Sequence, residues 1–229
     1  DQTILAFNFS EQYRLPVLVM MDECVGHMTE KVVIPPADEI EIVPRKWYQG
    51  AVGDYLPYQP DEDMIPWMVK AGDGHRFHTT GLTHDEKGYP VMNAQCQEKC
   101  VRRLVDKIRS NADEIVILEE SEIDGADVIV VSYGISSRVA IPAIERARAE
   151  GLRVGSLRLV TVWPFPESRI RELANDVMSF VIPEINYGQM SYEIERCAAG
   201  RARTILVPHG GGWVHDAEDI YRAIKEGAE

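Results

Sequence analysis

The sequence predicts an α/β protein built around a doubly wound parallel sheet. In the second half of the chain, apolar segments of strand length alternate with helical segments. These strands are apolar along their whole length rather than at every second residue. Strand–helix alternation produces βαβ units, and a strand that is apolar on both faces needs helices on both sides of its sheet.

The first 34 residues predict a helix followed by a buried strand. The helix covers Thr3 to Tyr13, and the almost wholly apolar strand covers Leu15 to Met21. Since the first residue is Asp1 and a helix starts at once, we expect the chain to begin inside a domain. The strand ends at Asp22 and Glu23, at the kind of position where ligands and partners meet an α/β fold. Adjacent carboxylates on a strand point to opposite faces, which argues against a simple acid–base pair.

Residues 35–112 predict an irregular arm that ends in a helix. No helical period is present before residue 90, and only Glu39 to Val43 alternates like a strand. So long an irregular connection is unusual inside a compact domain, so we expect it to pack on a partner. Prolines recur along it, at Pro35, Pro36, Pro44, Pro57, Pro60, Pro66 and Pro90.

An amphipathic helix is predicted from Asn93 to Ser110. Its apolar stripe and its basic face follow a helical period. The stripe consists of Cys96, Cys100, Val101, Leu104, Val105 and Ile108, and the residues expected to face away are Arg102, Arg103, Lys107 and Arg109.

The remaining residues, 113–229, contain the alternation on which the fold class rests. The predicted strands are 115–118, 127–133, 153–160, 178–182 and 204–207. The helices between them end at Glu150, Asn175, Ala199 and Lys225, and Asp216 is expected to cap the last one. Pro142 is expected in or near the first turn of its helix, because proline interrupts a helix interior.

Two turns in this region suggest chemistry without establishing it. Asn186-x-Gly188-Gln189 lies between a strand and a helix, where backbone amides can bind an anion or an acidic partner group. The same residues also suit an ordinary βα turn, and both interpretations stay open. The loop from His209 to Trp213 is rich in glycine but lacks the lysine and hydroxyl residue of a phosphate-binding loop, which favours a flexible connection.

The densest group of polar residues lies between His78 and Gly88. It contains His78, Gly81, His84 and Asp85, and two imidazoles with nearby carboxylates are possible metal ligands. Their spacing matches no standard metal motif. A hydrogen-bonded loop placed against a partner is the favoured interpretation, and a metal-dependent hydrolase site is a weaker alternative.

Composition excludes several functions. The net charge of -13 argues against non-specific binding to nucleic acid and against docking on an anionic membrane. No apolar run is long enough to span a membrane. The four cysteines form no C-x-x-C pair typical of zinc or iron–sulfur sites, so free thiols in a reducing cytoplasm are expected.

Taken together, these segments resemble one family. LPVLVMMDECVGHMTEKVVIP is similar to the strand and exit loop that close the thiamine-pyrimidine domain of 2-oxoacid:ferredoxin oxidoreductase α subunits. FHTTGLTHDEKGYP resembles the turn that follows in the 2-oxoglutarate branch. ADVIVVSYGISSR, GSLRLVTVWPFP and EINYGQM resemble successive strands of that subunit's second domain, which has the transketolase C-terminal fold. The match covers essentially the whole chain in order.

The resemblance implies three parts and a reaction. Residues 1–34 would end a thiamine-pyrimidine-binding domain, 35–112 would form the arm and its helix, and 113–229 would form the transketolase C-terminal-like domain. The complex would decarboxylate a 2-oxoacid, 2-oxoglutarate by this likeness, on thiamine diphosphate with magnesium. Electrons would pass through iron–sulfur clusters to ferredoxin, and the acyl group would pass to coenzyme A. The implied partners are a β subunit, further γ or δ subunits and ferredoxin.

The resemblance also implies that the catalytic residues lie elsewhere. The family's Tyr-Pro-x-Thr-Pro motif and its catalytic glutamate have no counterpart here, so no catalytic residue is assigned and the isolated segment is expected to be inactive. We expect Asp22, Glu23, Gly188 and Gln189 to face a subunit interface. The 2-oxoisovalerate and pyruvate branches stay open as alternatives, and so does a docking module with no chemistry of its own.

Overall fold

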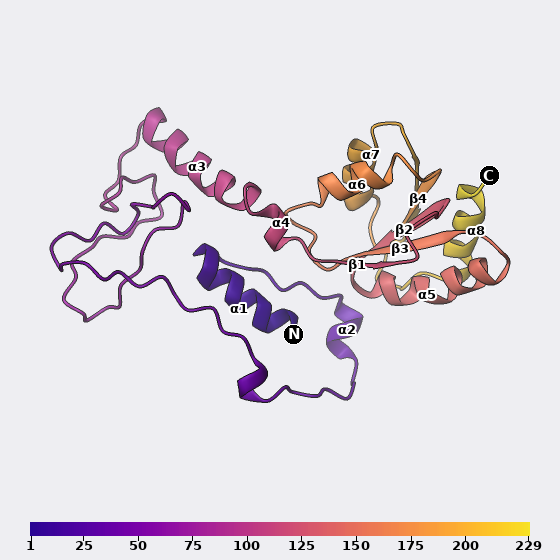
Figure 1. Ribbon diagram of the computed structural model, residues 1–229, viewed down its shortest axis with the longest axis horizontal. Coiled ribbons are helices and arrows are strands. Elements are labelled where there is room, and N and C mark those ends of the chain that lie inside the picture. The colour runs from indigo at the N-terminus through magenta and orange to yellow at the C-terminus, as the bar shows by residue number, and fades with distance from the viewer. The chain divides into compact units, whose positions relative to one another are not determined.

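The computed structural model describes residues 1–229, which form two compact units (Figure 1). We call Asp1–Met20 with Thr29–Asn111 the arm unit, and Met21–Met28 with Ala112–Glu229 the sheet unit. The arm unit contains helix α1 (Gln2–Tyr13), the short 3-10 helix η1 (Ala37–Glu39) and helix α3 (Ala94–Arg109). The sheet unit contains every strand and all the other helices.

The sheet unit has five strands in the order β1-β3-β2-β4-β5. Four pair in parallel, and β1 pairs antiparallel with β3 at the edge. The strands are β1 (Leu118–Ser121), β2 (Val128–Ser132), β3 (Val154–Leu159), β4 (Ser179–Glu184) and β5 (Arg203–Pro208). The predicted doubly wound α/β class is confirmed, and the sheet is mostly parallel because only the edge strand β1 is antiparallel.

Helices cover both faces of this sheet because β2 and β4 are buried on both sides. Figure 1 shows α6 (Glu167–Leu173) and α7 (Gln189–Ala198) on one face, and α5 (Gly134–Ala149) and α8 (Ala217–Gly227) on the other. Alternate residues of β2 enter two different cores. Ile129 packs with the α6–α7 side, and Val128 packs with the α5–α8 side. The short helices α2 (Glu23–His27) and α4 (Ala112–Ile115) complete the unit.

Two predicted strands are wrong. Leu15 to Met21 has no regular structure, and Leu18 and Met20 are about four-fifths exposed. A strand needs the backbone of a neighbour, and no segment of this chain pairs with it. Glu39 to Val43 is also irregular. Its first residue, Glu39, belongs to the 3-10 helix η1, and no neighbouring strand is present for the alternating side chains to pack on.

Three further details differ from the sequence prediction. Ile115 ends helix α4, and the strand starts only at Leu118, because the acidic Ala112–Ile115 segment forms a helical turn first. Pro142 lies inside α5 rather than in its first turn. Buried alanines of α5 on both sides of Pro142 hold the helix against the sheet and outweigh the missing hydrogen bond. Lys107, expected to face solvent, is buried.

Candidate functional site

The carboxyl edge of the sheet carries a polar network centred on Glu184, the last residue of β4. Its side chain is fully buried. One carboxylate oxygen, Oε2, accepts hydrogen bonds from the hydroxyl of Tyr133 at 3.0 Å and from the amide of Met190 at 2.9 Å. The other, Oε1, accepts from the amide of Ser191 at 2.7 Å. Burial, followed by the neighbouring Glu184 carboxylate, raises the pKa of the Tyr133 hydroxyl.

Asn186 extends this network into the turn before α7. Its Oδ1 accepts from the amides of Gly188 at 2.7 Å and Gln189 at 3.0 Å. Its Nδ2 donates to the hydroxyl of Tyr133 at 2.9 Å. Gly188 has φ +110°, a conformation that a residue with a side chain rarely adopts. The amides of residues 188–191 thus all have acceptors within the chain, which favours the ordinary βα turn over an anion cradle.

Asp22 joins the same edge of the sheet from the other end of the sequence. Its Oδ2 accepts from the amide of Ile135 at 2.7 Å and so caps the start of α5. A Cβ on Gly134 would lie 2.3 Å from this oxygen, so the close approach requires glycine there. Glu23 takes no part, because it is exposed and pairs with His27 at 3.1 Å.

Two histidines of the loop between β5 and α8 lie beside this network. The amide of His209 donates to the carbonyl of Glu184 at 2.9 Å. His215 is buried, its Nε2 donates to the carbonyl of Val207 at 2.8 Å, and its ring lies 5.5 Å from that of His209. Burial lowers the pKa of His215, so the neutral ring is favoured. The predicted cap at Asp216 is confirmed by its bond from the amide of Glu218 at 2.9 Å.

The other four predicted site residues lie in or beside one turn of the arm unit. Asp85 accepts from the amides of Lys87 and Tyr89, both at 3.0 Å. His84 is hydrogen-bonded to the carbonyl of Leu82 at 2.8 Å. The ring of His78 stacks on that of Tyr89 with centroids 5.1 Å apart, and Gly81 is exposed.

The structure therefore divides the predicted site residues into two groups. Asp22, Asn186, Gly188 and Gln189 gather at the carboxyl edge of the sheet unit, whereas His78, Gly81, His84 and Asp85 belong to the arm unit. No three histidine, cysteine or carboxylate side chains converge as metal ligands. The metal-hydrolase alternative therefore has no ligand set, and all four cysteines are free thiols.

Sequence reasoning missed Tyr133 and Glu184, which hold the network together. The available signal was a carboxylate at the end of the apolar run Ser179–Glu184, two residues before Asn186. A charged side chain at a fully buried strand end requires several donors, which points to the helix start that follows.

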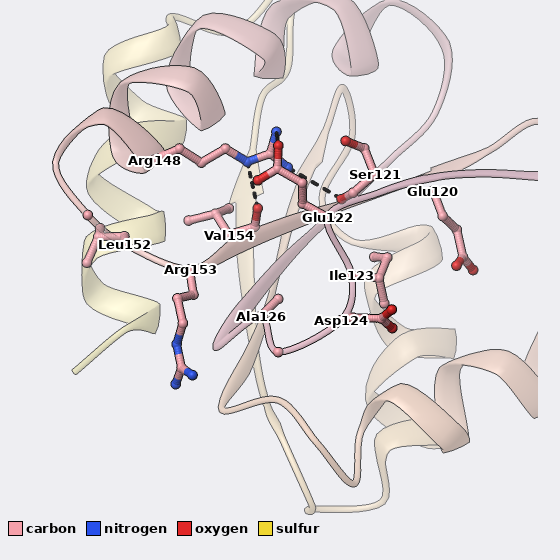
Figure 2. A pocket seen from close by; sticks show the side chains of 12 residues that line it. Glu120, Ser121, Glu122, Ile123, Asp124, Ala126, Arg148, Leu152, Arg153 and Val154 are labelled. Carbon is pink, nitrogen blue, oxygen red and sulfur yellow. Dashed lines mark hydrogen bonds and ion pairs between the residues drawn. The ribbon is translucent and has the colours of Figure 1, made fainter.

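A shallow pocket of about 580 Å³ lies at the opposite, amino-terminal edge of the sheet (Figure 2). Figure 2 shows Arg148 reaching the carbonyl of Val154 at 2.8 Å, and Arg148 also pairs with Glu122 at 3.0 Å. Arg153 in the same pocket pairs with Asp127. Its basic side chains are thus engaged with neighbouring groups.

No helix of the structure has the length and apolar character needed to cross a membrane.

Two family profiles match successive parts of the chain. Residues 1–103 match "Pyruvate flavodoxin/ferredoxin oxidoreductase, thiamine diP-binding", and residues 126–220 match "Pyruvate:ferredoxin oxidoreductase core domain II". The 2-oxoglutarate synthase subunit KorA of Methanothermobacter marburgensis is 45% identical over 98% of this chain. The chain belongs to the 2-oxoacid:ferredoxin oxidoreductase family. This membership confirms the resemblance that the sequence segments indicated.

The chain spans about three fifths or less of the length of the relatives that it matches. The ketoisovalerate oxidoreductase subunit VorB of Methanothermobacter thermautotrophicus is 34% identical over 99% of this chain. The chain spans 60% of the KorA relative and 56% of the VorB relative. The solved 2-oxoglutarate:ferredoxin oxidoreductase from Magnetococcus marinus, with 2-oxoglutarate, coenzyme A and succinyl-CoA bound, matches 97% of this chain and 39% of its own. The TM-score is 0.87 at 28% identity.

Proposed function

We propose that this chain is part of the α subunit of a thiamine-diphosphate-dependent 2-oxoglutarate:ferredoxin oxidoreductase. Its reaction would convert 2-oxoglutarate and coenzyme A to succinyl-CoA and carbon dioxide, with two electrons passing to ferredoxin. The observation that carries the proposal is the 45% identity to a 2-oxoglutarate synthase subunit over 98% of the chain. The lower identity of 34% to a ketoisovalerate relative favours the 2-oxoglutarate branch.

The chain shows no carboxylate set for the magnesium ion that accompanies thiamine diphosphate. No three histidine, cysteine or carboxylate side chains converge on one point. The helix start at α7 is also closed, because Glu184 and Asn186 occupy its amides. We therefore assign the cofactor, its magnesium and the iron–sulfur clusters to other parts of the subunit and to the β, γ or δ partners. No catalytic step is assigned to residues of this chain.

The part that we assign to this chain is structural and faces the partner subunits. We propose the division expected from the sequence, with a thiamine-pyrimidine-type end over 1–34, an arm over 35–112 and a transketolase C-terminal-like domain over 113–229. Leu15 to Met21 would complete a sheet contributed by residues beyond these 229, because an exposed apolar segment with unpaired backbone suits strand addition. The free thiols agree with a reducing compartment such as the cytoplasm.

The carboxyl edge of the sheet unit is the surface that we assign to subunit contact. The inner network of Tyr133, Glu184 and Asn186 fixes the start of α7, and Gln189 is exposed on that start. In the full-length enzyme, Gln189→Ala should weaken association with the β subunit, measured by native mass spectrometry. Glu195→Ala, an exposed change farther along α7, is the control. Unchanged assembly of both the Gln189→Ala and the Asp22→Ala enzymes would contradict this assignment.

The activity is tested with the full-length subunit co-produced with its β subunit. Coenzyme A-dependent reduction of a viologen dye would be measured with 2-oxoglutarate, 2-oxoisovalerate and pyruvate. We expect 2-oxoglutarate to be the preferred substrate by kcat/KM. Preference for another oxoacid would move the chain to that branch. No activity from an assembled, cofactor-loaded complex would overturn the oxidoreductase proposal and favour the docking module.

A further inference from the structure

Three basic side chains of the arm unit lie together without a carboxylate. Arg14, at the end of α1, donates from Nη1 to the carbonyls of Pro57 at 2.6 Å and Trp67 at 3.1 Å. Lys107, on α3, is 1% exposed and donates from Nζ to the carbonyl of Tyr13 at 2.5 Å. Arg103, one helical turn before Lys107, donates from Nη1 to the carbonyl of Met64 at 3.3 Å. We call these three residues the cationic cluster.

The cationic cluster lacks a counter-charge within the chain. Its hydrogen bonds go to main-chain carbonyls and to the phenol of Tyr55. Burial first, and then the positive charges of Arg103 and Arg14, lower the pKa of Lys107 to about 8. This is unusual in a chain with 37 acidic and 24 basic side chains. A buried cation is normally paired, so the missing anion is expected from outside the chain.

A pocket of about 310 Å³ opens next to the cluster and is lined by Arg103. Tyr58 also lines it, and the guanidinium of Arg14 lies 5.5 Å from the centre of that ring. His84 also packs against the Tyr58 ring, with centroids 3.9 Å apart. The pocket therefore combines an arginine with two flat rings that can contact carbon atoms of a small ligand.

The charged neighbours of Arg103 in this pocket are Asp85, Glu86 and Lys99. Glu86 pairs with Lys99, and Oδ1 of Asp85 accepts from two backbone amides, so neither carboxylate pairs with Arg103. Arg103 itself makes one hydrogen bond, whereas a guanidinium has five N–H donors. Arg103 is thus the member of the cluster that has free donors at an open surface.

We propose that this pocket binds a small metabolite bearing a carboxylate or phosphate group. The oxyanion pairs with Arg103, and its charge would offset the positive charges of Arg14 and Lys107, which lie near Arg103 but do not line the pocket. Arginine suits this role because its planar fork matches both oxyanions. The proposal rests on the arm unit alone and does not depend on the proposed function.

The test is calorimetric titration of the 229-residue chain at pH 8 with succinate and, separately, with inorganic phosphate. We expect one or both anions to bind with a Kd of about 1 mM or tighter. Binding of succinate alone assigns a carboxylate ligand, and binding of phosphate alone assigns a phosphate ligand. Arg103→Ala should weaken binding at least tenfold. Arg102→Ala removes the neighbouring, solvent-exposed arginine that pairs with Glu98, and should leave the Kd unchanged.

A second readout does not depend on whether Arg103→Ala folds. An anion beside the cluster raises the pKa of Lys107, so binding at pH 8 to 9 should take up a proton. Titrations in two buffers of different ionisation enthalpy measure this uptake, and Lys107→Met should abolish it. Three results would overturn the proposal. They are no binding of either anion, an equal loss of affinity in the Arg103→Ala and Arg102→Ala chains, and binding without proton uptake.

Discussion

The two units differ in how much apolar surface they bury. In the sheet unit, helices cover both faces of fully buried central strands. The arm unit has the helices α1 and α3 and few buried apolar side chains. Those of the arm unit include Tyr13, Tyr55, Ile65 and Ile108. Its long loops are held by polar and cation–π contacts, such as Lys46 over Trp67 and the Arg45–Glu11 pair. Apolar burial contributes far more stability than exposed ion pairs. The difference indicates that the sheet unit is stabilised by its own core, and it supports the proposal that contacts with partner subunits add to the stability of the arm unit.

The largest expected effect comes from the core of the sheet unit. Phe180 is fully buried in β4, so Phe180→Ala should lower the free energy of unfolding by about 4 kcal/mol. Leu18→Ala removes an apolar side chain that is 81% exposed, and should change it by less than about 0.5 kcal/mol. Urea denaturation monitored by circular dichroism measures both. A similar loss in the two variants would remove the contrast between the units.

Lys107 makes the stability of the arm unit depend on pH. Its folded pKa of about 8 lies below the 10.5 of a free lysine, so the unfolded chain binds more protons between these values. The free energy of unfolding should therefore rise from pH 8 to 10.5, by up to about 3 kcal/mol. Fluorescence of Trp47 and Trp67 reports on this unit, after the two other tryptophans are replaced by phenylalanine. If the free energy of unfolding of the Lys107→Met chain rose by the same amount over this pH range, the pH dependence could not be assigned to Lys107.

The Glu184 network should have a moderate effect. Glu184→Gln keeps the shape but removes a charged acceptor that serves two amides and a hydroxyl. We expect a loss of about 2 kcal/mol in the free energy of unfolding. The matched change at the exposed Glu195, also on α7, should be neutral. Urea denaturation of both variants measures the difference. If Glu184→Gln left the free energy of unfolding unchanged, the buried carboxylate would add no stability to the start of α7.

The smallest predicted effect separates two adjacent carboxylates. Asp22→Ala removes the cap of α5 and should cost about 1 kcal/mol. Glu23→Ala removes an exposed side chain whose partner is His27, and should cost less than about 0.5 kcal/mol. Thermal unfolding of the two variants side by side provides the comparison. Equal melting temperatures would show that the Asp22 cap adds no stability.

The same contrast explains what the sequence could predict. Segments such as Val128–Ser132 and Ala217–Gly227 carry their own apolar pattern and fold against one another, so their type was evident. Leu15 to Met21 has an equally apolar pattern, but a strand depends on partners that pattern cannot reveal. Lys107 sits at a helical position that suits solvent, yet the carbonyl of Tyr13, 94 residues away in sequence, accepts its hydrogen bond. Tyr133 became recognisable as a site residue only once the fold brought its hydroxyl to Glu184.

Hydrogen exchange of the 229-residue chain, alone and within the assembled enzyme, tests the central claim most directly. In the chain alone, amides of β2 and β4 should exchange only by global unfolding, and those of residues 15–21 should exchange rapidly. Assembly should slow exchange at residues 15–21 and along the arm while leaving β2 and β4 unchanged. Protection of residues 15–21 in the chain alone, equal to that of β4, would contradict the claim that the arm unit depends on its partners.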